Sequence, residues 1–186
     1  MQLYAEGIGS WGDTAIIATS ANYADALSIS SYAYAKKAPV FLCDPDTGLT
    51  TQQRAALGKF KHIVVAGGTS AVPSRHLNGF NVKRLSGATR YDTSLAIARY
   101  ALGNGMKSDN LVFATGANFA DALAAGPLAG KTNSIMLLAE NASSPTVDYA
   151  SQLRNETSNA VIAGGENAVS RQTAVRIANN LGLKLS

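Results

Sequence analysis

The stretch Ala117-Asn-Phe-Ala-Asp-Ala-Leu123 decides the fold of this 186-residue chain, because it occurs twice. The other copy is Ala21-Asn-Tyr-Ala-Asp-Ala-Leu27, which lies 96 positions earlier and has Tyr in place of Phe. The match extends outward, so that Thr14–Leu27 and Asn110–Leu123 are identical at eight of fourteen positions. A match of this length indicates a duplicated unit, and any account of function has to explain why the chain carries it more than once.

The duplication predicts two units, residues 1–86 and residues 87–186. A second pair of matching segments, Val65–Val72 and Ile162–Val169, supports this division at an offset of 97. Residues 1–13 align with the end of a helical segment of the second unit, so the first unit is expected to begin inside a helix. Residues 183–186 resemble residues 82–86 and then stop. We therefore expect the chain to be a fragment of a longer protein with further units.

Each unit alternates short apolar runs with helical segments. Four apolar residues bounded by turn residues are typical of a strand buried on both faces of a parallel sheet. The alternation predicts an α/β fold of two tandem repeats, each a small parallel β-sheet flanked by helices. The predicted strands are residues 15–18, 39–42, 63–66, 111–114, 135–138 and 160–163. Helices are expected after each heptad, over 50–57, 93–102 and 146–153, and after each Gly-Gly pair.

The polar residues of the heptad suit the start of a helix. Asn118 is a favourable N-cap, and Asp121, three residues on, can reach back to the free amides of the first turn. Asn22 and Asp25 have the same spacing. We therefore predict helix capping for both aspartates. The same four side chains follow parallel strands at their carboxyl ends, where open α/β sheets bind ligands, so they are also binding candidates.

Composition narrows the classes of function. The formal charge of +4 favours an anionic partner, but the cations are scattered rather than clustered with aromatics, which argues against nucleic acid. No segment approaches the ~20 apolar residues of a membrane span. The single cysteine, Cys43, follows an apolar run and is expected to be a buried thiol. The two histidines, His62 and His76, have no counterparts in the other unit, which argues against a duplicated metal site.

Catalytic chemistry has little support in the sequence. Each copy of the heptad carries one carboxylate with a capping role, which is not an acid–base pair, and we find no nucleophile with its base. We predict a module without catalytic residues, metal or cofactor. An alternative is an α/β enzyme of a small phosphorylated or glycan substrate, suggested by the Gly-rich turns, with Asp121 and Lys131 as the residues to test. A pure oligomerisation scaffold is a third possibility.

Four segments, in this order, resemble the type 2 cell-wall-binding repeat of Gram-positive bacteria. They are Arg84–Thr93, Val112–Leu123, Ile135–Leu138 and Ala163–Val169. The resemblance covers essentially the whole chain as two units, of which the first lacks its opening segment. It implies a secreted, surface-retained protein that these repeats anchor non-covalently to an anionic cell-wall polysaccharide or teichoic-acid-like polymer, while a separate domain carries the activity.

The resemblance also implies an assembly with neighbouring repeats. Such repeats typically come in threes around a pseudo-threefold axis, and a two-repeat chain departs from that number. A missing third unit and a different assembly both remain open. Linked weak sites on a polymer gain avidity through effective concentration, which gives a physical reason for repetition.

The resemblance implies binding and anchoring roles for particular residues. Arg90 and Tyr91 match the family's Arg-Tyr step, and a guanidinium suits two-point contact with phosphate groups. Alternatively, Arg90 pairs internally with an aspartate such as Asp92 or Asp121. The polymer-binding candidates are therefore Arg84, Arg90 and Tyr91 from this segment and the heptad residues Asn22, Asp25, Asn118 and Asp121. An apolar anchoring motif is matched by Ile135, Leu137 and Leu138, which periodicity alone places in a core strand.

Overall fold

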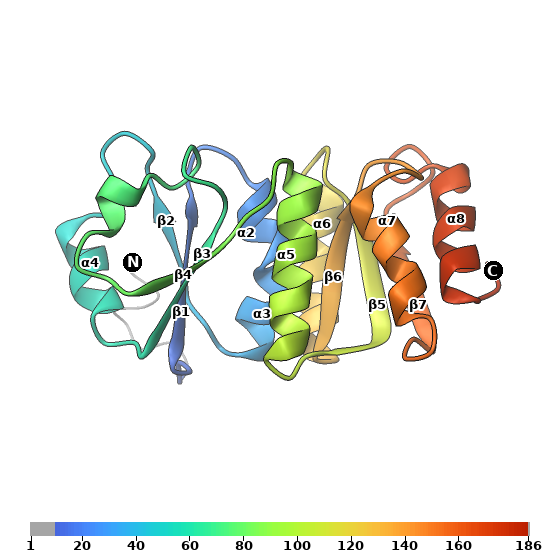
Figure 1. Cartoon of the computed structure of the whole chain (residues 1–186), viewed down its shortest axis with the longest axis horizontal. Coiled ribbons are helices and arrows are strands. Elements are labelled where there is room, and N and C mark those ends of the chain that lie inside the picture. Colours follow the sequence, from blue (N-terminus) through green and yellow to red (C-terminus); the bar gives the residue numbers. More distant parts are fainter. Residues whose placement is uncertain (1–9, 186) are drawn as a thin grey trace.

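The chain folds into two parallel β-sheets, each followed by helices, in a computed structural model that describes residues 10–185 (Figure 1). The expected helical start of the first unit falls largely on residues 1–9, outside the described part. The first sheet has the order β2-β1-β3-β4 and the second the order β6-β5-β7. These results confirm the predicted fold class. The strands are β1 (Thr14–Thr19), β2 (Val40–Cys43), β3 (His62–Ala66), β4 (Val82–Leu85), β5 (Lys107–Thr115), β6 (Ser134–Ala139) and β7 (Asn159–Ala163).

The helices largely follow the predicted segments. They are α2 (Ala24–Ser28), α3 (Ser30–Ala35), α4 (Thr51–Leu57), η1 (Ser74–Leu77), α5 (Arg90–Gly103), α6 (Ala120–Lys131), α7 (Pro145–Tyr149), η2 (Ala150–Leu153) and α8 (Arg171–Leu181). Helix α5 begins three residues before the predicted start, because Thr89 and Asp92 form a reciprocal capping box. Ser170 caps α8 by accepting a hydrogen bond from the Thr173 amide.

One predicted helix is wrong. After Gly67-Gly68 the chain forms only the 3₁₀ turn η1, whereas the matching segment of the second unit forms the full helix α8. Gly79, at a φ of 87°, follows closely and turns the chain away from a helical path. Similarly, residues 183–185 form no strand, although their sequence resembles that of β4.

The two units share a hydrophobic core. Helix α5 lies between the sheets, and its buried residues Ile97, Ala98 and Ala101 belong to one cluster with residues of both (Figure 1). That cluster includes Val64 of the first sheet and Phe113 of the second. Helix α5 opens the second unit and also covers the sheet of the first unit. The two units are therefore packed as one body.

A second contact between the units joins α3 to α6. Gly126 and Gly130 of α6 are buried against Ser30, Ser31 and Tyr34 of α3. Any side chain at these glycines would collide with α3, since a Cβ at Gly126 would lie 1.8 Å from Ser30 Oγ. The helices approach as closely as they do because both positions lack a side chain.

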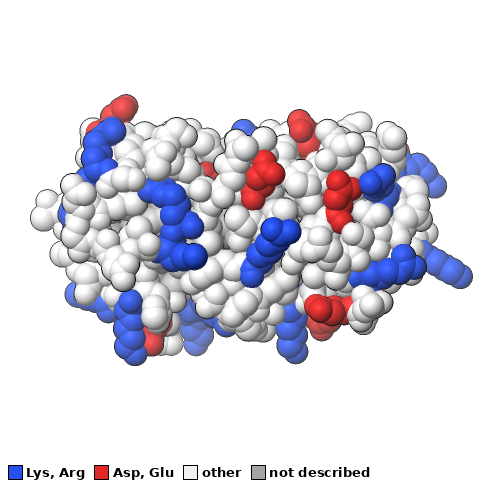
Figure 2. All heavy atoms as spheres, in the orientation of Figure 1, with Lys and Arg blue, Asp and Glu red and all other residues white. Residues whose placement is uncertain are grey.

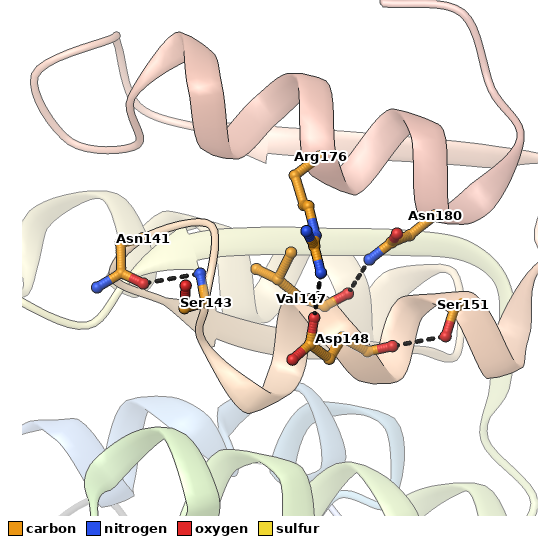
Figure 3. A network of polar contacts seen from close by, with 7 residues as sticks. All are labelled: Asn141, Ser143, Val147, Asp148, Ser151, Arg176 and Asn180. Atoms are coloured by element: carbon orange, nitrogen blue, oxygen red, sulfur yellow. Dashed lines mark hydrogen bonds and ion pairs between the residues drawn. The ribbon is translucent and has the colours of Figure 1, made fainter.

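The outer side of the second unit is closed by α8, which packs on α7 (Figure 3). Asn180 Nδ2 donates to the Val147 carbonyl at 2.7 Å, and Arg176 forms an ion pair with Asp148 at 2.9 Å. The ion pair is exposed and adds little stability, so the backbone contact and the buried face of α8 hold the helix.

Cys43 is fully buried, as predicted. No helix within residues 10–185 is long and apolar enough to cross a membrane.

Candidate functional site

The asparagines of the two heptads form turns just before their helices. The Oδ1 atoms of Asn22 and Asn118 accept from the amides of Ala24 and Ala120, each at 3.2 Å. The N-cap positions are occupied by the following residues, Tyr23 and Phe119, so each helix begins one residue later than predicted. The asparagines are exposed at the carboxyl ends of β1 and β5, where a ligand can reach them.

The predicted capping role of the two aspartates is wrong. Neither Asp25 nor Asp121 accepts a hydrogen bond from its own helix terminus. Each carboxylate instead lies against the glycine that directly follows a neighbouring strand. A Cβ placed on Gly67 would lie 2.5 Å from Asp25 Oδ2, and one on Gly164 would lie 2.5 Å from Asp121 Oδ2. Because the helices begin later than predicted, these aspartates point across the sheet edge rather than back along the chain.

Asp25 is buried, with 8% of its surface exposed, and this burial raises the pKa of its carboxyl group. The positive charge of Arg90 acts in the opposite direction and lowers that pKa. Arg90 itself donates to the Gly116 carbonyl at 2.6 Å. Its guanidinium therefore stands where the two units meet, with a carboxylate of the first unit and a backbone carbonyl of the second close by.

The internal partners predicted for Arg90 are not the ones the structure shows. Within residues 10–185, Arg90 forms no ion pair within 4.0 Å, and Asp92 is engaged in the capping box with Thr89. Arg90 is an exposed residue at the start of α5. Five donors with one carbonyl partner leave capacity for an external anion.

Aromatic residues lie beside the Gly116–Ala117 backbone to which Arg90 donates. The Tyr91 hydroxyl has a raised pKa, first because of burial and then because of Glu140. The Tyr23 hydroxyl donates to the Ala117 carbonyl at 2.7 Å, and its ring meets the Phe119 ring edge-on at 5.9 Å between centroids. We call this set the unit joint: Tyr23, Arg90, Tyr91, Phe119 and the backbone of residues 116–117. Tyr23 was missed by sequence reasoning, although the Tyr/Phe difference between the heptads was a signal that only one copy can donate.

Arg84 is already engaged in internal contacts. Its Nη1 donates to the carbonyls of Gly67 and Gly68 at 2.8 and 3.1 Å, and its Nη2 donates to the Val72 carbonyl at 2.9 Å. We call this contact the arginine clamp. It fixes the loop after β3, and it leaves Arg84 fewer donors for a polymer than Arg90 has.

The apolar anchoring motif lies in the core. Ile135, Leu137 and Leu138 of β6 are all 1% exposed or less. This placement confirms the core-strand interpretation that periodicity favoured. A direct contact between these side chains and a polymer would require the second unit to open.

Replacing Asp25 is expected to change how stability depends on pH. The folded-state pKa of this carboxyl lies above its unfolded value, so its protonated form favours folding below the unfolded pKa. This contribution is lost as the pH rises through the folded pKa. Asp25→Asn should therefore be more stable than the parent at pH 7, with a smaller difference near pH 4. Urea unfolding at both pH values measures the effect, and Asp121→Asn is the matched control. A difference that does not depend on pH would contradict the assignment.

Arg84→Met is expected to destabilise the first unit. The variant keeps the aliphatic stem but loses all bonds of the arginine clamp, and charged hydrogen bonds of this kind are worth about 1.5–3 kcal/mol. The free energy of unfolding should fall by about 2 kcal/mol. Arg75→Met, which removes a single bond to the Pro45 carbonyl, is the control and should cost less. If denaturant titrations show the same loss of unfolding free energy for both variants, the arginine clamp does not stabilise the fold more than a single surface hydrogen bond does.

Comparison with known proteins agrees with the repeat organisation. The cell wall binding domain 2 (CWB2) family matches residues 2–77 and 84–180. The chain is 33% identical over 168 residues to N-acetylmuramoyl-L-alanine amidase LytC of Bacillus subtilis (strain 168), covering 87% of this chain and 33% of LytC. It is 30% identical over 149 residues to the amidase enhancer of the same organism, covering 76% of this chain and 19% of that protein.

Two solved structures share the fold. Cwp6 from Clostridium difficile superposes with a TM-score of 0.80 at 23% identity, over 91% of this chain and 28% of that chain. Cwp8 from the same organism gives a TM-score of 0.79 at 22% identity, over 94% and 30%. The chain thus spans about a third or less of each protein it matches. The family match covers both units and most of the chain. The chain therefore belongs to the cell wall binding domain 2 family, and it is a cell-wall-binding module that acts at the cell surface.

Proposed function

We propose that this module holds a secreted protein non-covalently on an anionic cell-wall polymer, and that any catalytic activity lies in another part of the protein. The observation that carries the proposal is the exposed Arg90 at the unit joint, where, among residues 10–185, the Gly116 carbonyl alone accepts a hydrogen bond from its guanidinium. A planar cation of this kind suits the phosphate or carboxylate groups of a polymer.

The distribution of charge supports a long partner rather than a compact one. Figure 2 shows lysines and arginines spread along the visible face of the molecule. Scattered cations with a formal net charge of +4 suit a chain of repeated anionic groups, because many weak contacts add up through effective concentration. Such contacts are screened by salt, so the affinity is expected to fall as ionic strength rises.

We assign different roles to the candidate residues. Arg90, Tyr91, Asn22 and Asn118 are proposed to contact the polymer, since they are wholly or partly exposed at the carboxyl edges of the sheets. The other polar candidates shape the loops on which those contacts depend: Arg84, Asp25 and Asp121. The units are proposed to be residues 1–86 and 87–186, with the segment that opens the second unit also covering the first.

An assembly with a further repeat is part of the proposal. In the first unit, Leu27 and Tyr32 are 8% and 3% exposed because the second unit covers them. Their counterparts in the second unit, Leu123 and Leu128, are 58% and 48% exposed. A threefold or pseudo-threefold arrangement would bury this face in the same way as the first.

Retention on purified walls tests the proposal. The chain should sediment with intact walls and should be released when the anionic polymer is extracted or when salt is raised. Arg90→Gln should weaken retention several-fold, whereas Arg171→Gln, which removes the same charge from the start of α8, should not. If the chain is retained equally on intact walls and on walls without the anionic polymer, the proposal that it binds this polymer is wrong. Turnover of a small phosphorylated or glycan substrate that is lost in Asp121→Asn or Lys131→Ala, with wall retention kept, would instead favour the enzyme alternative.

A further inference from the structure

The arginines and the lysines of this chain have different surroundings. Each of the eight arginines contacts another group of the protein, through hydrogen bonds, an ion pair or, for Arg99, a position 5.0 Å from the centre of the Tyr149 ring. Among residues 10–185, Lys61 is the only lysine whose ammonium group forms a hydrogen bond or ion pair, with Asp13 at 2.7 Å. The positive charge without an internal partner in this part of the chain therefore belongs to lysines.

The lysines lie at one end of the strands. Seven of the eight stand where a helix ends or where the next strand begins, which is the amino-terminal edge of both sheets. They are Lys36, Lys37, Lys59, Lys61, Lys83, Lys107 and Lys131. All of them except the half-buried Lys36 are exposed. Positive groups accordingly project along the lower edge of the view in Figure 2, where the strands of Figure 1 begin. We call these seven residues the lysine edge.

The carboxylates are distributed in the opposite way. Seven lie at the carboxyl-terminal edge of the sheets, after a strand or in the first turn of the helix that follows it: Asp25, Asp44, Asp46, Asp92, Asp121, Glu140 and Glu166. Within residues 10–185 only three lie at the amino-terminal edge, namely Asp13, Asp109 and Glu156. The lysine edge thus has four more positive than negative groups, which equals the formal net charge of +4 of the whole chain.

Loops of both units meet at the lysine edge. The Lys36 ammonium of the first unit lies 3.7 Å from the position of a Cβ on Gly105. The Gly105 carbonyl accepts from Asn133 Nδ2 at 3.0 Å, and the Lys107 amide donates to the Asn133 carbonyl at 2.8 Å. These contacts bring the ends of α3, α5 and α6 together, with Lys131 two residues before Asn133. The row of lysines therefore crosses the boundary between the units.

Helix capping explains only part of this row. Lysines at the ends of α3 and α6 are stabilised by the helix dipole, but Lys83 and Lys107 belong to the starts of strands. Lys37 has a φ of 49°, in the left-handed region that favours Gly or Asn, and its counterpart in the second unit is Asn133, at a φ of 55°. No lysine lies in the repeated segments 14–27, 65–72, 110–123 or 162–169. The duplication therefore gives no sign of this surface, which only the fold assembles.

We propose that the lysine edge is a second polyanion-binding surface, along which a flexible polymer of repeating anionic groups lies across both units. The inference rests on the proposed function for its partner, but it places these contacts at the opposite end of the strands from Arg90. Exposed ammonium groups are hydrated point charges, so each contact is weak, tolerant of the kind of anion and screened by salt. The affinity of the row then depends on the length of the polymer, because one strand links many such contacts.

Binding of linear polyphosphate tests the lysine edge, since this probe offers only repeated anionic groups. The amino-edge variant combines Lys37→Asn, Lys107→Gln and Lys131→Gln. Its affinity should fall by about tenfold or more, and the slope of log affinity against log salt should become shallower by about two. Its thermal midpoint should stay near that of the parent, because the three side chains are exposed and Asn is the residue of the second unit at the Lys37 position. Tripolyphosphate, which is too short to follow the row, should bind weakly to both proteins.

A carboxyl-edge variant is the matched control. Asn141→Asp, Asn167→Asp and Gln172→Glu lower the net charge by the same amount at exposed positions of the other edge, and together they should weaken polyphosphate binding by less than about threefold. The proposal is overturned if both variants lose the same affinity, if the amino-edge variant binds like the parent, or if Arg90→Gln alone removes polyphosphate binding.

Purified walls separate this inference from the proposed function. On intact walls the amino-edge variant should be released at a lower salt concentration than the carboxyl-edge variant. If the parent is retained equally on walls without the anionic polymer, the proposed function is wrong, while a loss of polyphosphate affinity confined to the amino-edge variant would still support the lysine edge as a polyanion-binding surface. If the two variants are released from intact walls at the same salt concentration, the lysine edge does not contact the wall polymer.

Discussion

Gly126→Ala is expected to lower the free energy of unfolding by about 1–3 kcal/mol, and Ser30→Gly is expected to restore most of that loss. The new Cβ would lie 1.8 Å from Ser30 Oγ and 2.8 Å from Ser30 Cβ, and the next atom, the Ser30 carbonyl carbon, would be 3.7 Å away. The collision at Gly126 therefore involves one side chain. Removing that side chain should relieve it.

Gly130→Ala tests the close approach of α6 to the backbone of α3. A Cβ at Gly130 would lie 2.6 Å from Tyr34 Cβ but also 2.8 Å from the Ser31 carbonyl oxygen, which belongs to the backbone of α3. Shortening a side chain on α3 cannot remove that backbone collision, so α3 and α6 must separate. The loss at Gly130 should be at least as large as at Gly126, and Tyr34→Gly should not restore it.

Urea unfolding of the single and double variants measures these couplings. Gly103→Ala is the control, because Gly103 ends α5 with nothing within 4 Å of its would-be Cβ and should be neutral or slightly stabilising. A full restoration of the Gly130→Ala variant by Tyr34→Gly would contradict the close backbone approach. If Gly126→Ala costs no more than Gly103→Ala, the α3–α6 contact does not hold the units together.

The strands could be predicted well from the sequence because a strand that is buried on both faces has a continuous run of apolar residues. Ile16 and Ile17 follow one another in β1 and both are fully buried, and the same apolar continuity marks β5 and β6. Helix starts with a local capping box, such as Thr50 with Gln53, are also visible locally. These features depend on neighbours within a few positions, and prediction from sequence is strong for them.

The errors concern contacts between distant segments. Asp25 has the spacing of a capping residue, yet its carboxylate lies against Gly67, which is 42 positions later in the sequence. Arg84 was a polymer-binding candidate, but its partners are carbonyls of a loop 12–17 positions earlier. Backbone acceptors leave no mark in a sequence, because every residue has the same carbonyl. For this reason the polar candidates could be named from the sequence, but their division into internal and outward-facing groups could not.

Leu137→Ala is expected to cost about 2–5 kcal/mol of unfolding free energy, the usual price of truncating a fully buried leucine. Leu137 of β6 is 0% exposed and belongs to the hydrophobic core that the two units share. Leu42 of β2, in contrast, is 48% exposed, and Leu42→Ala should cost much less. Chemical denaturation of both variants gives the two values, and the pair separates burial from the mere loss of a leucine.

The same variant decides what the apolar anchoring motif contributes. If Ile135, Leu137 and Leu138 act by supporting the fold, Leu137→Ala should lose wall retention in step with its unfolded fraction and should bind normally at low temperature, where it is folded. If the motif touches the polymer after the unit opens, retention should be lost even when circular dichroism shows the variant folded. All three side chains are 1% exposed or less, so direct contact would require breaking the shared core, at a cost of several kcal/mol. We therefore expect retention and folding of Leu137→Ala to follow the same temperature curve.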